Sequence, residues 1–266
     1  MRRAGTCLFS LFLLMALFPG LVSPCDPWKR FDPYEPPGPA HWLGTNDLGN
    51  DVLAELIHGA RASLVVGLGT GILATALGLL VGMAAGYYRG AVDEVLMTLT
   101  DVTLMVPRIP MVIIVGFFLR PGAAVMVPVL GLLWWASTAR VVRSRAMQVR
   151  QMPFVAAARA LGFGDLHILR TDVLPHLLSV LVPKFLLTVA SAMITEASLS
   201  FLGLGDPSAK SWGMMIHYAF ERGGFVRGLW WWYLAPGLAT TLCVLSLVLI
   251  GSSAGGEEPL AAGPTE

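Results

Sequence analysis

Long apolar runs separated by short polar segments dominate the hydrophobic pattern of this 266-residue chain. A membrane-spanning helix needs roughly 20 apolar residues to cross a hydrocarbon core of about 30 Å. The pattern therefore predicts an all-α polytopic membrane protein with six transmembrane helices. The six apolar runs cover about residues 4–22, 62–87, 95–119, 123–138, 177–204 and 230–250.

The first apolar run allows two interpretations, a retained transmembrane helix over residues 1–24 or a cleaved signal peptide. Arg2 and Arg3 precede it, and the residues from Val22 to Cys25 faintly resemble a lipoprotein cleavage site. Pro24, next to that cysteine, argues against cleavage.

Residues 25–61 form a polar segment that we expect on the extracytoplasmic side. Residues 26–43 are rich in Pro, Trp, Tyr and charge, which indicates an extended stretch without a core. Residues 44–59 predict a short interfacial helix, capped by Asn46 or Asp47. The alternative is that this stretch simply leads into the next span. The apolar side of the expected interfacial helix would consist of Leu48, Val52, Leu56 and Ile57.

Residues 62–250 are expected to form a core of five transmembrane helices, and glycines mark one face of the first. Gly78, Gly82 and Gly86 recur every four residues, so they lie on one side of a helix. Small residues on one face allow two helices to approach closely in lipid, where association depends on packing. The pattern predicts a helix-packing face; a loosely packed, lipid-facing helix is the alternative.

Three charged residues, Asp101, Arg108 and Glu196, interrupt the apolar runs. Charged side chains inside a membrane usually face a bundle interior or a watery path. Asp101 and Arg108, together with Pro107 and Pro110, predict a broken, pathway-lining third span, whereas Glu196 belongs to the fifth. Alternatively, Arg108 pairs structurally with Asp101 or Glu196. For Glu196 itself we favour a structural hydrogen bond within the bundle, because Ser198 and Ser200 follow it.

A basic cluster predicts the orientation of the chain in the membrane. Positive charge favours the cytoplasmic side, so the loop over residues 139–176 is expected there. An even number of spans then puts both termini in the cytoplasm, with residues 251–266 as a disordered tail. Trp230 to Tyr233 would form an aromatic belt at the outer interface. The basic cluster consists of Arg140, Arg143, Arg145 and Arg150, which also suit anionic lipid headgroups.

The loop contains a predicted helical hairpin over residues 154–175. Strong helix formers occupy residues 154–161, and Gly162 can adopt the left-handed conformation that ends many helices. Asp165 is expected to cap a second helix over residues 166–173, with Leu166, Leu169 and Val173 as its apolar stripe, and Pro175 to end it.

Three sequence stretches resemble those of a known family. AARALG at residues 157–162, followed by Leu174 and Pro175, resembles the EAA loop of permease subunits of binding-protein-dependent ABC importers. HWLGTNDLGNDVLAELIHGARASL (41–64) and EASLSFLGLG (196–205) resemble the peptide/nickel branch of that family. Together these similarities cover most of the chain after residue 40. The acidic residue that names the loop is replaced here by Ala156, which puts its contact in doubt.

The resemblance implies a subunit that translocates dipeptides, oligopeptides or nickel across the cytoplasmic membrane. It implies a second homologous permease, two ATPase subunits that bind ATP and Mg, an extracytoplasmic binding protein and surrounding lipid. It also favours a retained first membrane helix, because the family places one there. The implied ATPase-docking residues are Ala157, Ala158, Arg159, Ala160, Leu161, Gly162, Asp165, Leu174 and Pro175.

Composition and missing motifs narrow the alternatives. The chain is 55% hydrophobic and 13% charged with a net charge of +1, so nothing in it indicates a nucleic-acid partner. It has no GxxxxGK[ST] loop for nucleotide, and neither its five His nor its three Cys show metal-ligand spacing. We therefore expect no cofactor bound by this chain and no enzyme activity of its own. The alternative function is a membrane scaffold or intramembrane enzyme that uses the hairpin as a partner-docking site.

Overall fold

The computed structural model describes residues 2–119 and 122–255, and within them the chain is helical apart from turns and two isolated β-bridges. The all-α prediction is confirmed. The helices are α1 (Arg2–Leu17), α2 (Pro19–Val22), α3 (Val52–Tyr88), α4 (Gly90–Met105), α5 (Arg108–Phe118), α6 (Ala123–Arg150), α7 (Pro153–Ala160), α8 (Asp165–Ile168), η1 (Leu169–Val173), α9 (Leu174–Leu199), η2 (Ser200–Leu204), α10 (Trp212–Glu221) and α11 (Trp230–Gly255).

Four of the helices in the described ranges are long and apolar enough to cross a membrane: α3, α6, the continuous helix Asp165–Leu204 and α11. Helices α4 and α5 meet at an angle of 76° and make a fifth span if they are taken together. The prediction of a broken third span agrees with this bend. The first expected span, residues 4–22, corresponds to α1, which has only 16 residues, fewer than the roughly 20 that a span needs, so the count of six stays a prediction.

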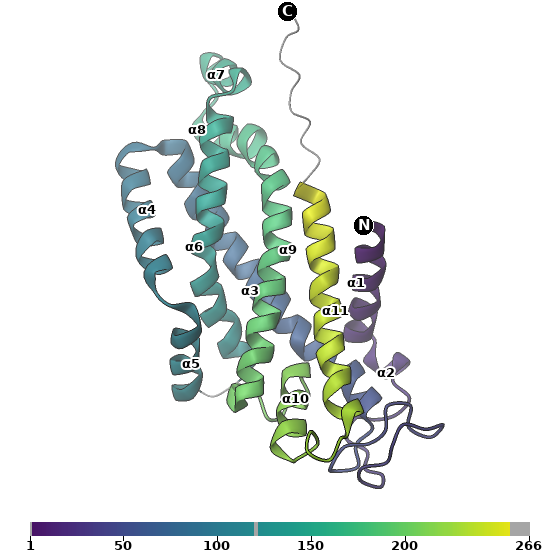
Figure 1. The fold of residues 1–266 in the computed structure, drawn as a ribbon. Helices are drawn as coiled ribbons and strands as arrows, with labels where there is room; N and C mark the ends of the chain where they lie inside the picture. Colours follow the sequence, from purple (N-terminus) through teal and green to yellow (C-terminus); the bar gives the residue numbers. More distant parts are fainter. Residues whose placement is uncertain (1, 120–121, 256–266) are drawn as a thin grey trace, which may run out of the picture.

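The long helices form one bundle whose two ends differ (Figure 1). The hairpin of α7 and α8 projects from one end, whereas α10 and the segment between α2 and α3 cover the other. Helix α1 runs beside α11, where a Cβ added at Gly5 would lie 3.0 Å from the Cβ of Leu249. The start of α1 and the end of α11 therefore lie close together, on the side of the bundle that carries the hairpin (Figure 1).

The glycine face of α3 packs directly against α6. A Cβ added at Gly82 would lie 2.4 Å from the carbonyl oxygen of Ala139, and one at Gly86 would lie 2.6 Å from that of Arg143. At Gly78 it would lie 2.6 Å from the Cβ of Thr138. These distances are shorter than a van der Waals contact, so the two backbones can approach this closely only where α3 lacks side chains.

The polar segment before α3 contains no interfacial helix, so the prediction for residues 44–59 is wrong. Helix α3 begins at Val52 and continues to Tyr88, and the carboxylate of Asp51 caps it by accepting a 2.8 Å hydrogen bond from the Ala54 N–H. The residues before Asp51 fold into turns and β-bridges instead, because Asn46 binds neighbouring backbone N–H groups rather than capping a helix.

The expected aromatic belt is also largely absent, because only Trp230 is well exposed among the three tryptophans. Trp231 and Trp232 are 8% and 1% exposed, since α10 and the segment before α3 cover the start of α11. The Trp231 indole donates to the carbonyl oxygen of Thr45 at 3.3 Å. The predicted tail begins too early, because α11 continues to Gly255; its remaining residues, 256–266, lie outside the described part of the chain.

Candidate functional site

The hairpin begins with α7, and a glycine turn ends that helix as predicted. Gly162 has φ +85°, in the left-handed region. The Phe163 N–H donates to the Ala158 carbonyl at 3.2 Å and the Gly162 N–H to the Arg159 carbonyl at 3.0 Å. This pair of bonds is a Schellman motif, which satisfies carbonyls that the end of a helix leaves free. The turn therefore depends on a residue that tolerates positive φ.

The hairpin rests on an apolar base. Val155 of α7 and Ile168, Leu169 and Val173 of the returning helix are at most 7% exposed. They pack in one cluster with residues of α3, α6 and α9. Burial of four such side chains against three long helices fixes the hairpin relative to the bundle.

A polar contact joins the hairpin tip to the end of α3. The Tyr87 hydroxyl donates to Asp165 Oδ1 at 2.6 Å, and the Arg159 guanidinium lies 5.1 Å from the centre of the Tyr87 ring. The predicted cap at Asp165 is wrong, since Gly164 precedes the first helical residue and Asp165 makes no capping bond. Its carboxylate is used for the tertiary contact instead.

The outward face of the hairpin is apolar and accessible. Leu161, Phe163 and Leu166 are 77%, 48% and 61% exposed, so Leu166 does not belong to a buried stripe as predicted. Ala156, Ala157 and Ala160 are exposed beside them. A cluster of exposed apolar side chains on a fixed support is typical of a surface that another protein covers.

Pro175 does not end the hairpin, which corrects the prediction. The helix that starts at Asp165 continues past Pro175 through α9 and into η2, where Gly203 leaves the helical conformation with φ +82°. Residues 169–173, directly before Leu174 and Pro175, form a π-helical turn. A proline removes one backbone donor, and local π-type widening is one way in which membrane helices accommodate it. The hairpin and the fifth span are thus one continuous element.

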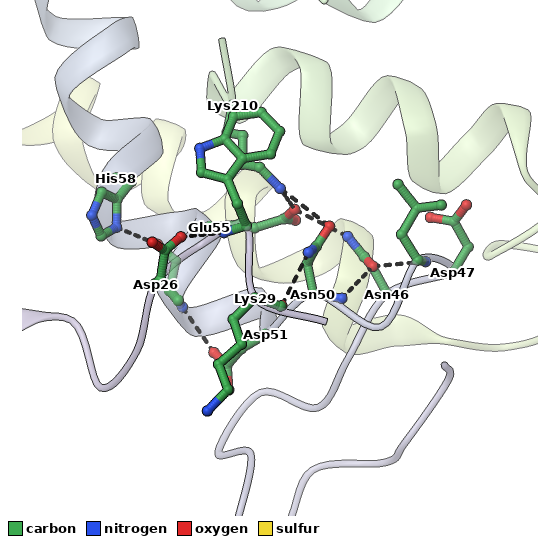
Figure 2. A network of polar contacts seen from close by, with 12 residues as sticks. Asp26, Lys29, Asn46, Asp47, Asn50, Asp51, Glu55, His58 and Lys210 are labelled. Carbon is green, nitrogen blue, oxygen red and sulfur yellow. Dashed lines mark hydrogen bonds and ion pairs between the residues drawn. The ribbon is translucent and has the colours of Figure 1, made fainter. Parts of the chain in front are cut away.

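At the opposite end of the bundle lies a buried polar network (Figure 2). It joins the segment before α3 and the first turn of α3 to Lys210, which lies two residues before α10. The Lys210 ammonium forms an ion pair with Glu55 and donates to Asn50 Oδ1 at 3.2 Å. Asn46 donates to the same Glu55 carboxylate at 3.1 Å. Asn46, Asn50 and Glu55 are all at most 5% exposed. The network holds the HWLGTNDLGND stretch in one conformation.

Further contacts tie this outer region together. Asp51 Oδ2 lies 2.7 Å from His41 Nδ1, and Arg222 forms an ion pair with Asp47. The Trp212 indole donates to the Leu56 carbonyl at 2.9 Å. The segment is therefore ordered, in contrast to the coreless stretch expected from its composition.

The three charged residues within the spans lie in different places. Asp101 pairs with Arg140 of α6 at 2.7 Å, and the Arg108 guanidinium lies 5.2 Å from the centre of the Trp134 ring. The alternative, in which Arg108 pairs with Asp101 or Glu196, is wrong. Glu196 is 3% exposed and its Oε1 accepts a 2.7 Å hydrogen bond from Ser200, as we expected for one of the two neighbouring serines.

Sequence reasoning did not single out Tyr87, Glu55 or Lys210, although each fixes one end of the bundle. Glu55 and Lys210 are charged residues next to apolar runs, a signal that could have marked both. Tyr87 carries no such signal, because its partner Asp165 lies 78 residues away.

A bundle of long apolar helices with an exposed helical hairpin at one end defines a multi-pass membrane protein. The chain belongs to the family described as "Binding-protein-dependent transport system inner membrane component", whose profile matches residues 78–255. It is thus an inner-membrane transport subunit.

Named relatives agree with this family, and a solved structure shares the fold. The chain is 36% identical over 212 residues to a putative peptide permease protein of Brucella suis biovar 1 (strain 1330), covering 79% of this chain and 70% of the relative. It is 33% identical over 257 residues to the di/tripeptide transport system permease protein DppC of Pseudomonas aeruginosa (strain UCBPP-PA14), covering 93% and 84%. An inward-facing structure of the MetNI methionine ABC transporter shares the fold, with a TM-score of 0.61 at 18% identity, over 75% of this chain and 94% of that chain.

Proposed function

We propose that this chain is a permease subunit of an ABC importer for short peptides, and that its hairpin docks an ATPase subunit. The observation that carries the proposal is the hairpin itself: an exposed apolar face on a buried base, in a chain similar to named peptide permeases. A docking element has to be accessible at its tip and rigid at its root, and this hairpin is both.

The proposal includes a second, homologous permease, two ATPase subunits that bind ATP and Mg, and an extracytoplasmic binding protein that contacts the other end of the bundle. The hairpin end, with the start of α1 and the end of α11, then faces the cytoplasm. Arg140, Arg143, Arg145 and Arg150 all lie in the half of α6 that leads to the hairpin, which fits this orientation.

The geometry also indicates how a movement of the ATPase would reach the membrane. The hairpin packs on α6 and on the end of α3, and its second arm is the start of a helix that continues to Leu204. A push on the tip is therefore delivered to three spans at once. A membrane scaffold or an intramembrane enzyme would not require this continuous connection between the hairpin and the spans.

A pair of glycine substitutions tests the role of the hairpin. Gly162 and Gly164 both have open space where a Cβ would be added, but only Gly162 has positive φ; Gly164 is extended at φ −71° and ψ 155°. A valine at Gly162 is strained by roughly 1–2 kcal/mol, whereas a valine at Gly164 is not. Gly162→Val should distort the tip without affecting the spans, and Gly164→Val serves as the matched control.

The measurements are copurification with the ATPase subunits and ATP hydrolysis stimulated by peptide-loaded binding protein in reconstituted membranes. We expect Gly162→Val to insert and to bind the second permease, but to lose ATPase binding or stimulation, while Gly164→Val behaves as wild type. If both variants retain full binding and stimulation, the hairpin does not transmit the ATPase movement and the proposed function loses its main support.

A further inference from the structure

A cavity of about 540 Å³ opens near the outer end of the bundle, between α3, the start of α6, the end of α9 and residues 206–211. Its volume falls in the range of about 300–1,000 Å³ that small-molecule sites occupy. The wall is mainly apolar, with contributions from Trp28, Val65 and Met126. Charged groups of both signs, including Glu196 and Arg61, also line it.

Glu196 is the unusual member of this wall. The residue is 3% exposed, Oε1 accepts the bond from Ser200, and Oε2 is buried without a hydrogen-bond partner among the residues that the structure describes. The hydroxyls of Ser63 and Ser211 also face this carboxylate. Leaving a buried carboxylate oxygen unpaired is costly, so a cationic donor that reached it from the cavity would be stabilised there.

The cationic side chains around the cavity do not pair with Glu196 Oε2. Lys210 lines the cavity but is already bound to Glu55 and Asn50. Arg61 is exposed and forms no ion pair within the described ranges. Asp206 also lines the cavity, and its Oδ1 accepts hydrogen bonds from the N–H and the hydroxyl of Ser208. Glu196 Oε2 and the Arg61 guanidinium thus present one negative and one positive group to the cavity, which is the charge pattern complementary to a zwitterion.

We propose that this cavity binds a short peptide, with its α-ammonium group on Glu196 and its α-carboxylate on Arg61. An ammonium carries three donors, which match Glu196 Oε2 and the acceptor oxygens of the two nearby serines, and a guanidinium is a preferred carboxylate partner. The inference rests on the proposed function and adds a binding site for its substrate within this subunit. A metal ion is a poorer occupant, because the described residues contain no group of three or more His, Cys, Asp or Glu side chains that could hold one.

The test uses the assembled permease and ATPase complex in lipid nanodiscs without binding protein, so that only the membrane site is probed. Equilibrium binding is measured for Ala-Ala, N-acetyl-Ala-Ala and Ala-Ala-amide. The key variant is Glu196→Gln, which keeps the shape and the bond to Ser200 but removes the charge. Glu221→Gln, at an exposed acid that does not line the cavity, is the matched control.

We expect Glu196→Gln to weaken Ala-Ala binding by about tenfold or more, since hydrogen bonds to charged groups are among the stronger ones. N-acetylation should cost the wild type a similar factor and cost Glu196→Gln little. Arg61→Gln should show the same pattern with Ala-Ala-amide. Glu221→Gln should bind all three peptides as wild type does.

Equal affinity of wild type for the free and the N-acetylated peptide would overturn the inference, even if Glu196→Gln failed to assemble. Unchanged Ala-Ala binding by Glu196→Gln would do the same. The proposed function is checked separately in the same preparation, through ATP hydrolysis stimulated by peptide-loaded binding protein. If the wild type shows that stimulation but no dependence on Glu196, only the inference about the cavity fails.

Discussion

The close contact between α3 and α6 allows one prediction to be worked out from distances. Gly82 lies at the centre of the glycine face, and a Cβ there would meet the Ala139 carbonyl oxygen at 2.4 Å and the Val142 Cβ at 2.8 Å. Ordinary contacts begin at 3.4 Å, so Gly82→Ala must separate the helices by about 1 Å or distort them. The obstacle is backbone, which cannot rotate away as a side chain could.

Two effects of opposite sign decide the result. Replacing a helical glycine with alanine favours the helix by up to about 1 kcal/mol. Overpacking costs about 1–3 kcal/mol, and a gap of 0.5–1 Å removes roughly a quarter to a half of each dispersion contact along the separated seam. We expect overpacking to win, so that Gly82→Ala destabilises the subunit by about 1–2 kcal/mol and Gly82→Leu prevents its assembly.

Gly237 in α11 is the control, because a Cβ there meets nothing within 4 Å. Gly237→Ala should be neutral or slightly stabilising, since only the helix propensity changes. Unfolding of the purified subunit in mild detergent, titrated with a denaturing detergent, compares the two variants. If Gly82→Ala is as stable as Gly237→Ala, the glycine face does not hold α3 against α6 and the packing argument is wrong.

Two further predictions concern the outer end and the topology. Lys210→Met should destabilise the outer region by about 3–5 kcal/mol, because it leaves the buried Glu55 carboxylate without its cation. The readout is faster proteolysis within residues 25–51. Adding Glu55→Gln to this variant should restore part of the protection. Cysteines introduced beside Asp165 and beside Lys210, in a chain whose three native Cys are replaced with Ser, should react with a membrane-impermeant reagent from opposite sides of the membrane; labelling from the same side would contradict the proposed orientation.

Features set by neighbouring residues could be predicted from the sequence. The turn at Gly162 follows from a helix-forming run and a glycine, and the packing face of α3 follows from a spacing of four. The break in the third span follows from its two prolines. Each of these patterns lies within a short stretch of sequence, so each feature can be recognised from nearby residues alone.

Features that depend on distant partners could not be predicted in this way. Asp165 has the position of a helix cap, but a tyrosine 78 residues away binds its carboxylate. Glu55 pairs with Lys210, 155 residues further along the chain, and that pair orders a segment whose composition indicates no core. Trp231 and Trp232 have the composition of a lipid-facing belt, yet α10 buries them against the polar segment. In each case the competing local signal was real, and a tertiary contact outweighed it.

The error at Pro175 matters most for function, because it changes how the two ends of the molecule are connected. A proline stop would have separated the hairpin from the fifth span by a flexible joint. The structure instead continues helically from Asp165 to the kink at Gly203, with the hairpin at the start of this helix and Glu196 near its end. Its two π-helical stretches, Leu169–Val173 and Ser200–Leu204, lie just after the hairpin tip and just after Glu196. Such widened turns are frequent at functional sites. Between them α9 is one continuous helix that contains Pro183. A displacement of the hairpin that neither η1 nor the turn at Pro183 absorbs must therefore move the carboxylate that lines the outer cavity.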